Sequence, residues 1–322
     1  MLLLMCVPVL AFPGALPGPR VVSADDHLTV HHAFQDVAGG HVRHPSLSDP
    51  ALQFKAIRRR VVDDLSHGRA PLWNPDILVG TDLLGDGQSM AASPVTLLHV
   101  VLDEDTAQDA GVAFTLLWTG LGLALLAATL GAGPWAALAA GVAAMTGPMP
   151  FVWLLHPHAA TFAWLPWLLL AVERRSPWLA AAVTAGLLCG GHPGTMVHAL
   201  GIAAVWWGLR ARAPRVAIGV IAGALIAGPV VGPLIEAGLA SVTVDARGHT
   251  PLVAAQLLDL LWPGALGHPA GAGYAGPGAW ADGQLHPGLG ALALAIFAAA
   301  RDPRARWLTA GWALCVALAL AP

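Results

Sequence analysis

The sequence predicts an all-α, polytopic membrane protein with one large polar loop near its N-terminus. Only 11% of its 322 residues are charged and 56% are hydrophobic, whereas about a quarter of the residues in a soluble domain are charged. The deficit is local, because residues 111–130 and 134–155 carry no charge. Either stretch is long enough to cross a hydrocarbon core of about 30 Å as a helix. The net charge of −3 argues against a nucleic-acid partner.

The expected elements follow one another simply along the chain. Residues 1–13 form an apolar run, which we expect to be the remnant of a first membrane helix, and residues 14–105 form a polar loop with most of the acidic residues. Residues 106–322 supply the remaining helices, for a total of about eight or nine. Several are short for a span, which favours tilted, half-inserted or re-entrant helices. The expected apolar segments are 111–130, 134–155, 157–172, 177–190, 194–209, 216–238, 287–300 and 307–321.

Arginines in the short connections predict an orientation. They fall in every second connection, whereas connections 156–158 and 190–194 carry neither lysine nor arginine. The positive-inside rule places the arginine-bearing connections in the cytoplasm. The 14–105 loop and residues 240–286 then face outward, and chemistry is expected on the extracytoplasmic side. The arginines of the cytoplasmic connections are Arg174, Arg175, Arg210, Arg212, Arg215, Arg301, Arg304 and Arg306.

Within the polar loop, residues 50–67 are predicted to form an amphipathic helix. Apolar residues recur at helical spacing from Phe54 to Leu65, and Gly68 supplies a stop. Two alternatives stay open for this helix. It could lie in the membrane interface, with its stripe in the acyl chains and its arginines on lipid phosphates, or it could pack on the protein as an ordinary amphipathic helix. The arginines concerned are Arg58, Arg59 and Arg60.

An aspartate pair, Asp25 and Asp26, follows the first apolar run. Such a pair at the membrane surface can deprotonate an acceptor hydroxyl or hold a divalent ion against a lipid phosphate. More usually, two successive aspartates mark a solvated loop start or a helix N-cap. His27 and His31 stand four residues apart, and on an α-helix they could present two imidazoles to one metal beside the aspartates. Solvated or phosphate-binding histidines are the other interpretation.

A proline-bounded loop, Pro71–Pro75, presents the indole of Trp73 and the carboxamide of Asn74. This loop is followed by Gln88 and by a Ser-Pro pair before the next apolar segment. Together with an aspartate outside the first helix, these features resemble the YfhO-type family of bacterial membrane glycosyltransferases, which have the GT-C fold. Later segments match the order of motifs in that family; they are His156 through Ala163–Pro166 to Glu173-Arg174, Gly190–Thr195, Leu260–Gly264 and Gly288–Ile296.

The resemblance implies one GT-C-like transmembrane domain over residues 1–322, in the bacterial cytoplasmic (inner) membrane. Such a protein moves a sugar from a polyprenyl-phosphate-linked donor to an extracytoplasmic envelope glycan, lipid or protein acceptor. The family's catalytic aspartate, a general base, is matched by Asp25 or Asp26. Membrane lipids and the acceptor are then the other partners. The side chains expected to contact substrate are His27, Trp73, Asn74, Gln88, His156, His158 and His192.

A divalent cation, Mg²⁺ or Mn²⁺, could assist the reaction, with Asp25, Asp26, His27 and His31 as the available ligands. Members of the family are typically longer, and this chain ends within an apolar run, which indicates a truncated member. The alternative from another class is a non-catalytic membrane protein, either a carrier of lipid-linked sugars or an inactive fragment of a glycosyltransferase. A carrier usually needs several ionisable residues along its path, and the predicted spans hold few.

Overall fold

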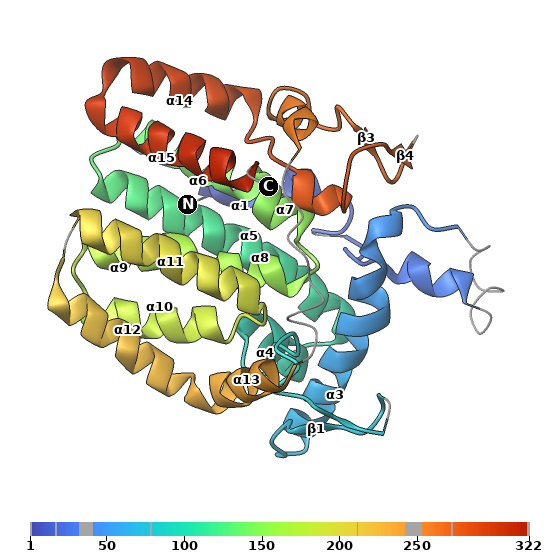
Figure 1. The fold of residues 1–322 in the computed structure, drawn as a ribbon. Coiled ribbons are helices and arrows are strands. Elements are labelled where there is room, and N and C mark those ends of the chain that lie inside the picture. Colours follow the sequence, from blue (N-terminus) through green and yellow to red (C-terminus); the bar gives the residue numbers. More distant parts are fainter. Residues whose placement is uncertain are drawn as a thin grey trace. The chain divides into compact units, whose positions relative to one another are not determined.

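The computed structural model describes residues 2–16, 18–31, 41–77, 79–210, 212–241, 253–271 and 273–320, and these are mostly helical (Figure 1). The chain separates into two compact units, which are treated one at a time. Unit 1 comprises Met1–Val42, Leu47–Met145 and Met149–Ser241; unit 2 comprises Arg43–Ser46, Thr146–Pro148 and Val242–Pro322. The single domain expected over residues 1–322 stays a prediction.

Unit 1 combines a helical bundle with a long polar segment. The polar segment holds the 3₁₀ helix η1 (Asp25–Val30), the π-helical turn η4 (Pro50–Phe54), α3 (Lys55–Ser66), and the antiparallel strands β1 (Trp73–Asn74) and β2 (Thr81–Asp82). A short 3₁₀ turn, η3 (Pro45–Leu47), precedes η4. The bundle is formed by α1 (Leu2–Ala11), α4 (Pro94–Val101), α5 (Glu104–Thr129), α6 (Pro134–Thr146), α7 (Pro148–Val152), α8 (Pro157–Phe162), α9 (Leu165–Glu173), α10 (Pro177–Leu188), α11 (Pro193–Arg210), α12 (Pro214–Ile226) and α13 (Gly228–Ala240).

Prolines begin most of the helices in the bundle, including α6, α8, α10, α11 and α12. Proline suits the first helical position, because its missing N–H would have no partner there and its φ is already helical. The long helix α5 begins differently, after the N-cap residue Asp103, whose Oδ1 accepts a hydrogen bond from the Thr106 backbone N–H at 3.0 Å. The sequence therefore marks most of these helix starts with a proline or a capping side chain.

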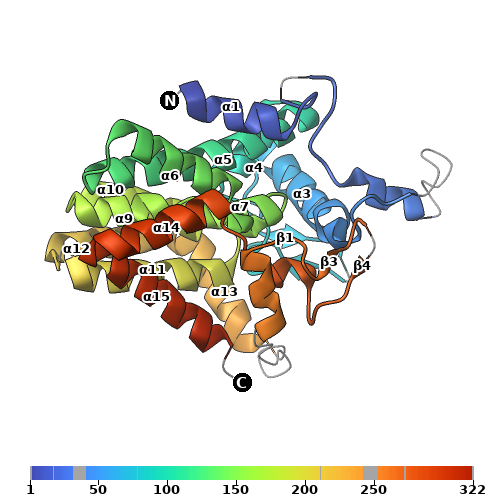
Figure 2. The same cartoon turned by 90° about the horizontal axis from the view of Figure 1, so that it is seen from above.

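The core of unit 1 lies around α9, which packs against α5, α10 and α11, and α10 in turn packs along α12 (Figures 1 and 2). Leu168 and Leu170 of α9 are fully buried. Gly219 and Gly223 lie one turn apart on α12, and a Cβ at either would collide with the backbone carbonyl of Pro177 or Ala181 on α10. Small residues at this spacing allow two helix backbones to approach closely, as they do in membrane helices.

Two helices are long and apolar enough to cross a membrane: α5, and the stretch Pro134–Val152 that contains α6 and α7. A third span is obtained if α12 and α13 are taken together, although they are bent by 78° at the break between them. The break falls at Ala227, directly before Gly228-Pro229 in the first turn of α13, where proline has no N–H to continue the hydrogen bonding of α12. The described residues thus contain two or three candidate spans, fewer than the eight or nine expected from hydropathy.

The difference has a visible cause, because several predicted segments are broken. The expected segment 157–172 divides into α8 and α9, and 216–238 divides into α12 and α13. Large apolar side chains nevertheless remain outside the core: Val205 and Leu209 of α11 are 64% and 77% exposed, and Leu225 of α12 is 74% exposed. An apolar surface of this kind is typical of contact with membrane or protein. The helices therefore carry a membrane signature, although most are shorter than a full span.

Unit 2 contains η5 (Ala254–Leu260), the antiparallel strands β3 (Gly267–His268) and β4 (Gly273–Tyr274), η6 (Trp280–Gly283), and a pair of adjacent helices, α14 (Leu289–Arg301) and α15 (Pro303–Ala319). The buried carboxylate of Asp259 organises the connection between η5 and α14. It accepts backbone hydrogen bonds from Gly264 at 2.9 Å, Leu285 at 2.8 Å and His286 at 3.2 Å. These bonds satisfy the carboxylate, so we regard Asp259 as structural.

Candidate functional site

The predicted amphipathic helix is present and runs from Pro50 to Ser66 as η4 and α3. Its apolar stripe is buried: Ile57 and Val61 are 3% and 0% exposed, and they pack with Leu83 and Leu84. The helix ends before Gly68, whose φ of 68° suits a glycine stop. The packed alternative therefore describes this stripe, because the protein covers the face that was considered for acyl chains.

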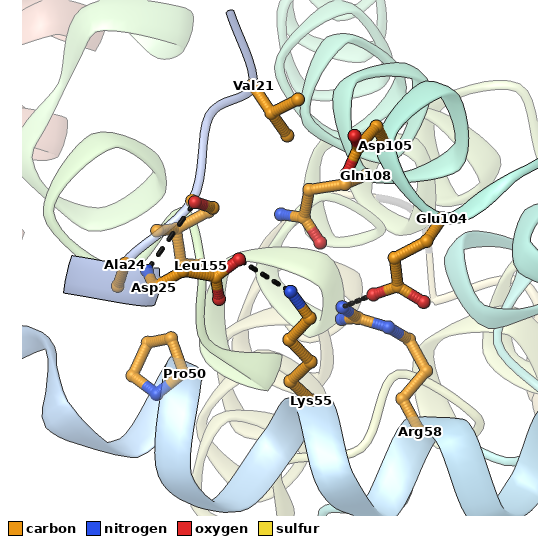
Figure 3. A pocket seen from close by; sticks show the side chains of 11 residues that line it. Val21, Ala24, Asp25, Pro50, Lys55, Arg58, Glu104, Asp105, Gln108 and Leu155 are labelled. Atoms are coloured by element: carbon orange, nitrogen blue, oxygen red, sulfur yellow. Dashed lines mark hydrogen bonds and ion pairs between the residues drawn. The ribbon is translucent and has the colours of Figure 1, made fainter. Parts of the chain in front are cut away.

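The same helix contributes two cations, Lys55 and Arg58, to a polar pocket (Figure 3). Lys55 Nζ lies 2.6 Å from Asp25 Oδ2. Arg58 Nη2 lies 3.2 Å from Oε1 of Glu104, in the first turn of α5. We call Asp25, Lys55, Arg58 and Glu104 the carboxylate–cation pocket. Gln108 and Leu155 also line it, and its cavity measures about 30 Å³, roughly the share of one water molecule in the liquid.

Arg58, like Lys55, is largely removed from solvent. Its side chain is 18% exposed, and its Nε has no hydrogen-bond partner in the structure. Burial lowers the pKa of Arg58 below its usual value, and the neighbouring Glu104 carboxylate opposes that shift. A guanidinium stays charged even so. The pocket therefore holds a partly desolvated cation with a donor to spare, which is an arrangement suited to an incoming anion.

Arg59 and Arg60 do not share this arrangement. Arg59 is 65% exposed and lies 4.0 Å from Glu104. Arg60 makes a 2.7 Å ion pair with Asp64, one turn further along α3. Asp64 is buried and also accepts from Arg69 at 2.9 Å. Arg60 therefore holds the end of the helix, and of the three arginines expected at lipid phosphates, Arg58 and Arg60 are already engaged by carboxylates.

The segment after Asp25 differs from the expected metal-binding helix. Residues Asp25–Val30 form a 3₁₀ helix, with His31 extended beyond its end. Residues four apart do not align on a 3₁₀ helix, which has three residues per turn. His27 is buried and His31 is exposed, and within the described part of the chain no three acidic, histidine or cysteine side chains come close enough to hold a metal ion. The α-helix assumed for the pairing of His27 and His31 was therefore wrong, and a metal at these residues stays a prediction.

Three of the predicted substrate residues do come together. His158 stacks on His192 with 3.4 Å between ring centroids, and the ring of His156 lies 6.0 Å from that of His158. Trp153 stacks on His158 at 4.1 Å. We call His156, His158 and His192 the histidine cluster. Segments 31 residues apart meet here, because the backbone N–H of His192 donates to Thr161 Oγ1 at 3.1 Å and fixes the loop before α11 on α8.

The polar atoms of the histidine cluster are only partly satisfied. Thr195 Oγ1 lies 2.8 Å from His192 Nδ1, whereas Nδ1 of His156 and Nδ1 of His158 are buried without a hydrogen-bond partner. Burial, together with the nearby His192, lowers the pKa of His156 to about 4 and that of His158 to about 3. Both imidazoles are therefore neutral near pH 7, and each offers one donor and one acceptor nitrogen.

The histidine cluster and the carboxylate–cation pocket adjoin the same turn of helix, at Phe54 and Lys55. Phe54, the last residue of η4, places its ring 5.6 Å from that of His156, edge to face. Lys55, the next residue, belongs to the carboxylate–cation pocket. Leu155, beside His156 in the chain, lines the same pocket. Gln88 contacts the same helix, because its Oε1 accepts a hydrogen bond from Gln53 Nε2 at 3.3 Å. The arrangement can thus present cations, a carboxylate and neutral imidazoles around one helical turn.

Trp73 and Asn74 lie elsewhere, on strand β1. The Trp73 ring is half-exposed and packs against Gly80, where a Cβ would collide with it. The Asn74 side chain is buried, and its Oδ1 accepts from the Asp76 backbone N–H at 3.1 Å. This is a local turn-forming bond. The structure thus gives both residues a role in shaping the β1–β2 ribbon, and their expected contact with substrate stays a prediction.

Sequence reasoning missed Lys55, Glu104 and Trp153 as members of the site. Lys55 is the only lysine in the chain, and that rarity was the one available signal. Glu104 looked like an ordinary first-turn acid of α5, and Trp153 like one more interfacial indole. Comparison of the chain with protein-family models, with curated proteins and with solved structures gave no match. The chemistry of the site therefore has to be argued from its geometry.

Proposed function

We propose that the protein is a GT-C-type membrane glycosyltransferase of the bacterial cytoplasmic membrane, related to the YfhO-type family. It would move a sugar from a polyprenyl-phosphate donor to an extracytoplasmic glycan, lipid or protein acceptor. The motif order described above supports this proposal, and so do the exposed apolar surfaces of α11 and α12. His192 precedes α11 and Arg210 ends it, so the histidine-bearing and arginine-bearing connections lie at opposite ends of one helix, as the proposed topology requires.

The carboxylate–cation pocket is the observation that carries the proposal. Sugar transfer from a lipid phosphate needs a base for the acceptor hydroxyl and a cation for the departing phosphate. Asp25 and Lys55 lie 2.6 Å apart in this pocket, and Arg58 lines the same cavity. Asp26 does not line it. We therefore assign the role of base to Asp25 in preference to its neighbour.

The proposed reaction uses these residues in one displacement. The acceptor hydroxyl oxygen attacks the anomeric carbon, and its proton passes to the Asp25 carboxylate. The bond between the anomeric carbon and the phosphate oxygen breaks, and its electron pair leaves with the polyprenyl phosphate. Arg58 and Lys55 balance the charge on that phosphate. When the donor phosphate binds Lys55, the ammonium group releases Asp25, which lets the carboxylate accept the proton.

The histidine cluster would hold the sugar in this scheme. Neutral imidazoles with free Nδ1 atoms can exchange hydrogen bonds with hydroxyl groups. Trp153, stacked on His158, closes one side of the cluster with an aromatic face. The cavity of the carboxylate–cation pocket is small, about 30 Å³, so in this scheme η4 and the residues around Leu155 would move apart to admit a sugar.

Substitution of the two aspartates tests the proposal. Asp25→Asn keeps the shape of the side chain but cannot accept a proton, so transfer of labelled sugar from a polyprenyl-phosphate donor should fall by about 10²–10⁴-fold. Asp26→Asn is the matched neighbour and should lose much less. Membrane levels and thermal stability of both variants serve as controls for folding. Normal transfer by both would reject the catalytic role and favour the non-catalytic alternative, a carrier of lipid-linked sugars or an inactive fragment.

A further inference from the structure

An apolar cavity of about 220 Å³ lies between α9, α11 and α12. Leu168, Ala204, Trp207 and Val220 are among its lining residues, and every lining side chain is aliphatic or aromatic. The only polar side-chain atom among them, Trp207 Nε1, already donates to the Ala213 carbonyl at 3.0 Å. Water needs two to four polar partners to occupy a cavity. The physical chemistry of the lining therefore favours a hydrocarbon occupant.

Arginines follow or precede several lining residues of this cavity in the chain. Val172, Trp207 and Val216 belong to its lining, and the connections that follow or precede them in the chain carry five arginines. We call these the arginine rim: Arg174, Arg175, Arg210, Arg212 and Arg215. All five are exposed. Among the ion pairs of the described residues, one involves the arginine rim: the Glu173 carboxylate lies 2.8 Å from Arg210. The rim is therefore strongly cationic.

The backbone of the rim is unusual as well. Arg175 and Arg212 have φ values of 50° and 43°, and they follow the ends of α9 and α11. Glycine is the favoured residue in this left-handed position, because it has no Cβ to collide with the following carbonyl. Within the described residues only Met90 shares such a φ without being glycine. Two helix ends thus carry arginine where glycine would be less strained, and Arg212 Nε donates to the Gly208 carbonyl at 2.7 Å, which caps the end of α11.

We infer that α9, α11 and α12 form a binding site for an anionic glycerophospholipid. One acyl chain occupies the apolar cavity, and the phosphate lies on the arginine rim. The surroundings suit a membrane lipid, since Val205 and Leu209 beside the cavity are exposed apolar residues. The site is separate from the histidine cluster, because α11 is 18 residues long and spans about 27 Å between its ends. The inference therefore does not depend on sugar transfer.

Lipid binding by the full chain in detergent tests this inference. Native mass spectrometry should show retention of phosphatidylglycerol in preference to phosphatidylcholine with the same acyl chains. A basic residue beside an anionic headgroup contributes about fivefold in affinity. Arg212→Gln with Arg215→Gln should therefore weaken binding of phosphatidylglycerol roughly 20-fold and leave phosphatidylcholine unchanged. Ala204→Phe, which fills the cavity from an exposed position, should weaken binding of both lipids.

Two matched variants make the test specific. Arg301→Gln with Arg306→Gln removes the same charge from α14 and α15, and Val205→Phe adds an aromatic ring to α11 outside the cavity. Both should retain phosphatidylglycerol like the unaltered chain. Equal retention of the two lipids, or an equal loss in the arginine control, would overturn the inference. Glycerol phosphate that displaces the lipid at equal concentration would also overturn it, by showing that the rim takes the anion without the acyl chain.

Discussion

The two ends of α11 have different surroundings. His192, directly before its first residue, packs among aromatic rings, whereas its last residue, Arg210, is exposed. At the histidine end, rings lie 3.4–6.0 Å apart and lowered pKa values keep His156 and His158 neutral. At the arginine end, the cations stay charged at any ordinary pH. One helix thus joins a tightly packed, titratable end to an open, permanently charged end. The two ends should respond differently to added volume, to acid and to loss of a charge.

Added volume should produce the largest difference. A Cβ at Gly190 would lie 2.6 Å from Thr161 Cα, so Gly190→Ala should destabilise unit 1 by about 1–3 kcal/mol through overpacking. At the arginine end, a Cβ at Gly208 meets nothing within 4 Å. Gly208→Ala should therefore stabilise by about 0.5–1 kcal/mol. Thermal unfolding in detergent measures both, and a shift of the same sign in both variants would contradict the comparison.

Acid should affect the histidine end alone. The pKa of His156 is about 4 in the folded protein and about 6.5 in an unfolded chain, so the unfolded state binds more protons between these values. Stability contributed by the neutral ring is complete above pH 6.5 and falls as the pH drops toward 4. His156→Phe should match the unaltered chain at pH 7.5 and exceed it by on the order of 1–2 kcal/mol at pH 5. Unfolding curves at the two pH values provide the test, and an unchanged pH slope would refute it.

Loss of a charge at the arginine end should have the smallest effect. Arg210 and Glu173 form an ion pair at 2.8 Å, with side chains 39% and 13% exposed. Such surface pairs contribute about 0–1 kcal/mol. A double-mutant cycle of Glu173→Gln and Arg210→Gln should return a coupling energy in that range, and salt should weaken it. A coupling above about 2 kcal/mol would show that this end is as tightly organised as the histidine end.

Local signals in the sequence predicted the helices best. The stripe from Phe54 to Leu65 gave the helix Pro50–Ser66 almost to the residue, because period and stop signal both lie within that segment. Fewer of the described helices than expected are long enough to span a membrane, because hydropathy ignores where a helix breaks. The Gly228-Pro229 pair that follows α12 and begins α13 lies inside an otherwise apolar run, so an average of hydropathy over that run does not detect the break.

Long-range geometry could not be predicted in the same way. The resemblance assigned His156, His158 and His192 to the site one by one, but their stacking depends on α8 meeting the loop before α11. The pairing of Asp25 with Lys55 joins residues 30 positions apart, and no periodicity reports such a contact. The error at His27 and His31 arose from assuming an α-helix, because a 3₁₀ helix places different side chains on one face.

The lengths of the helices set a condition on the proposed membrane setting. The 26 residues of α5 extend about 39 Å, whereas the 12 of α10 extend about 18 Å. A hydrocarbon layer of about 30 Å is thicker than α10 can match, and lipids beside a short helix thin to cover it. If the protein lies in a bilayer as proposed, the hydrocarbon layer would therefore be thinner beside α10 than beside α5.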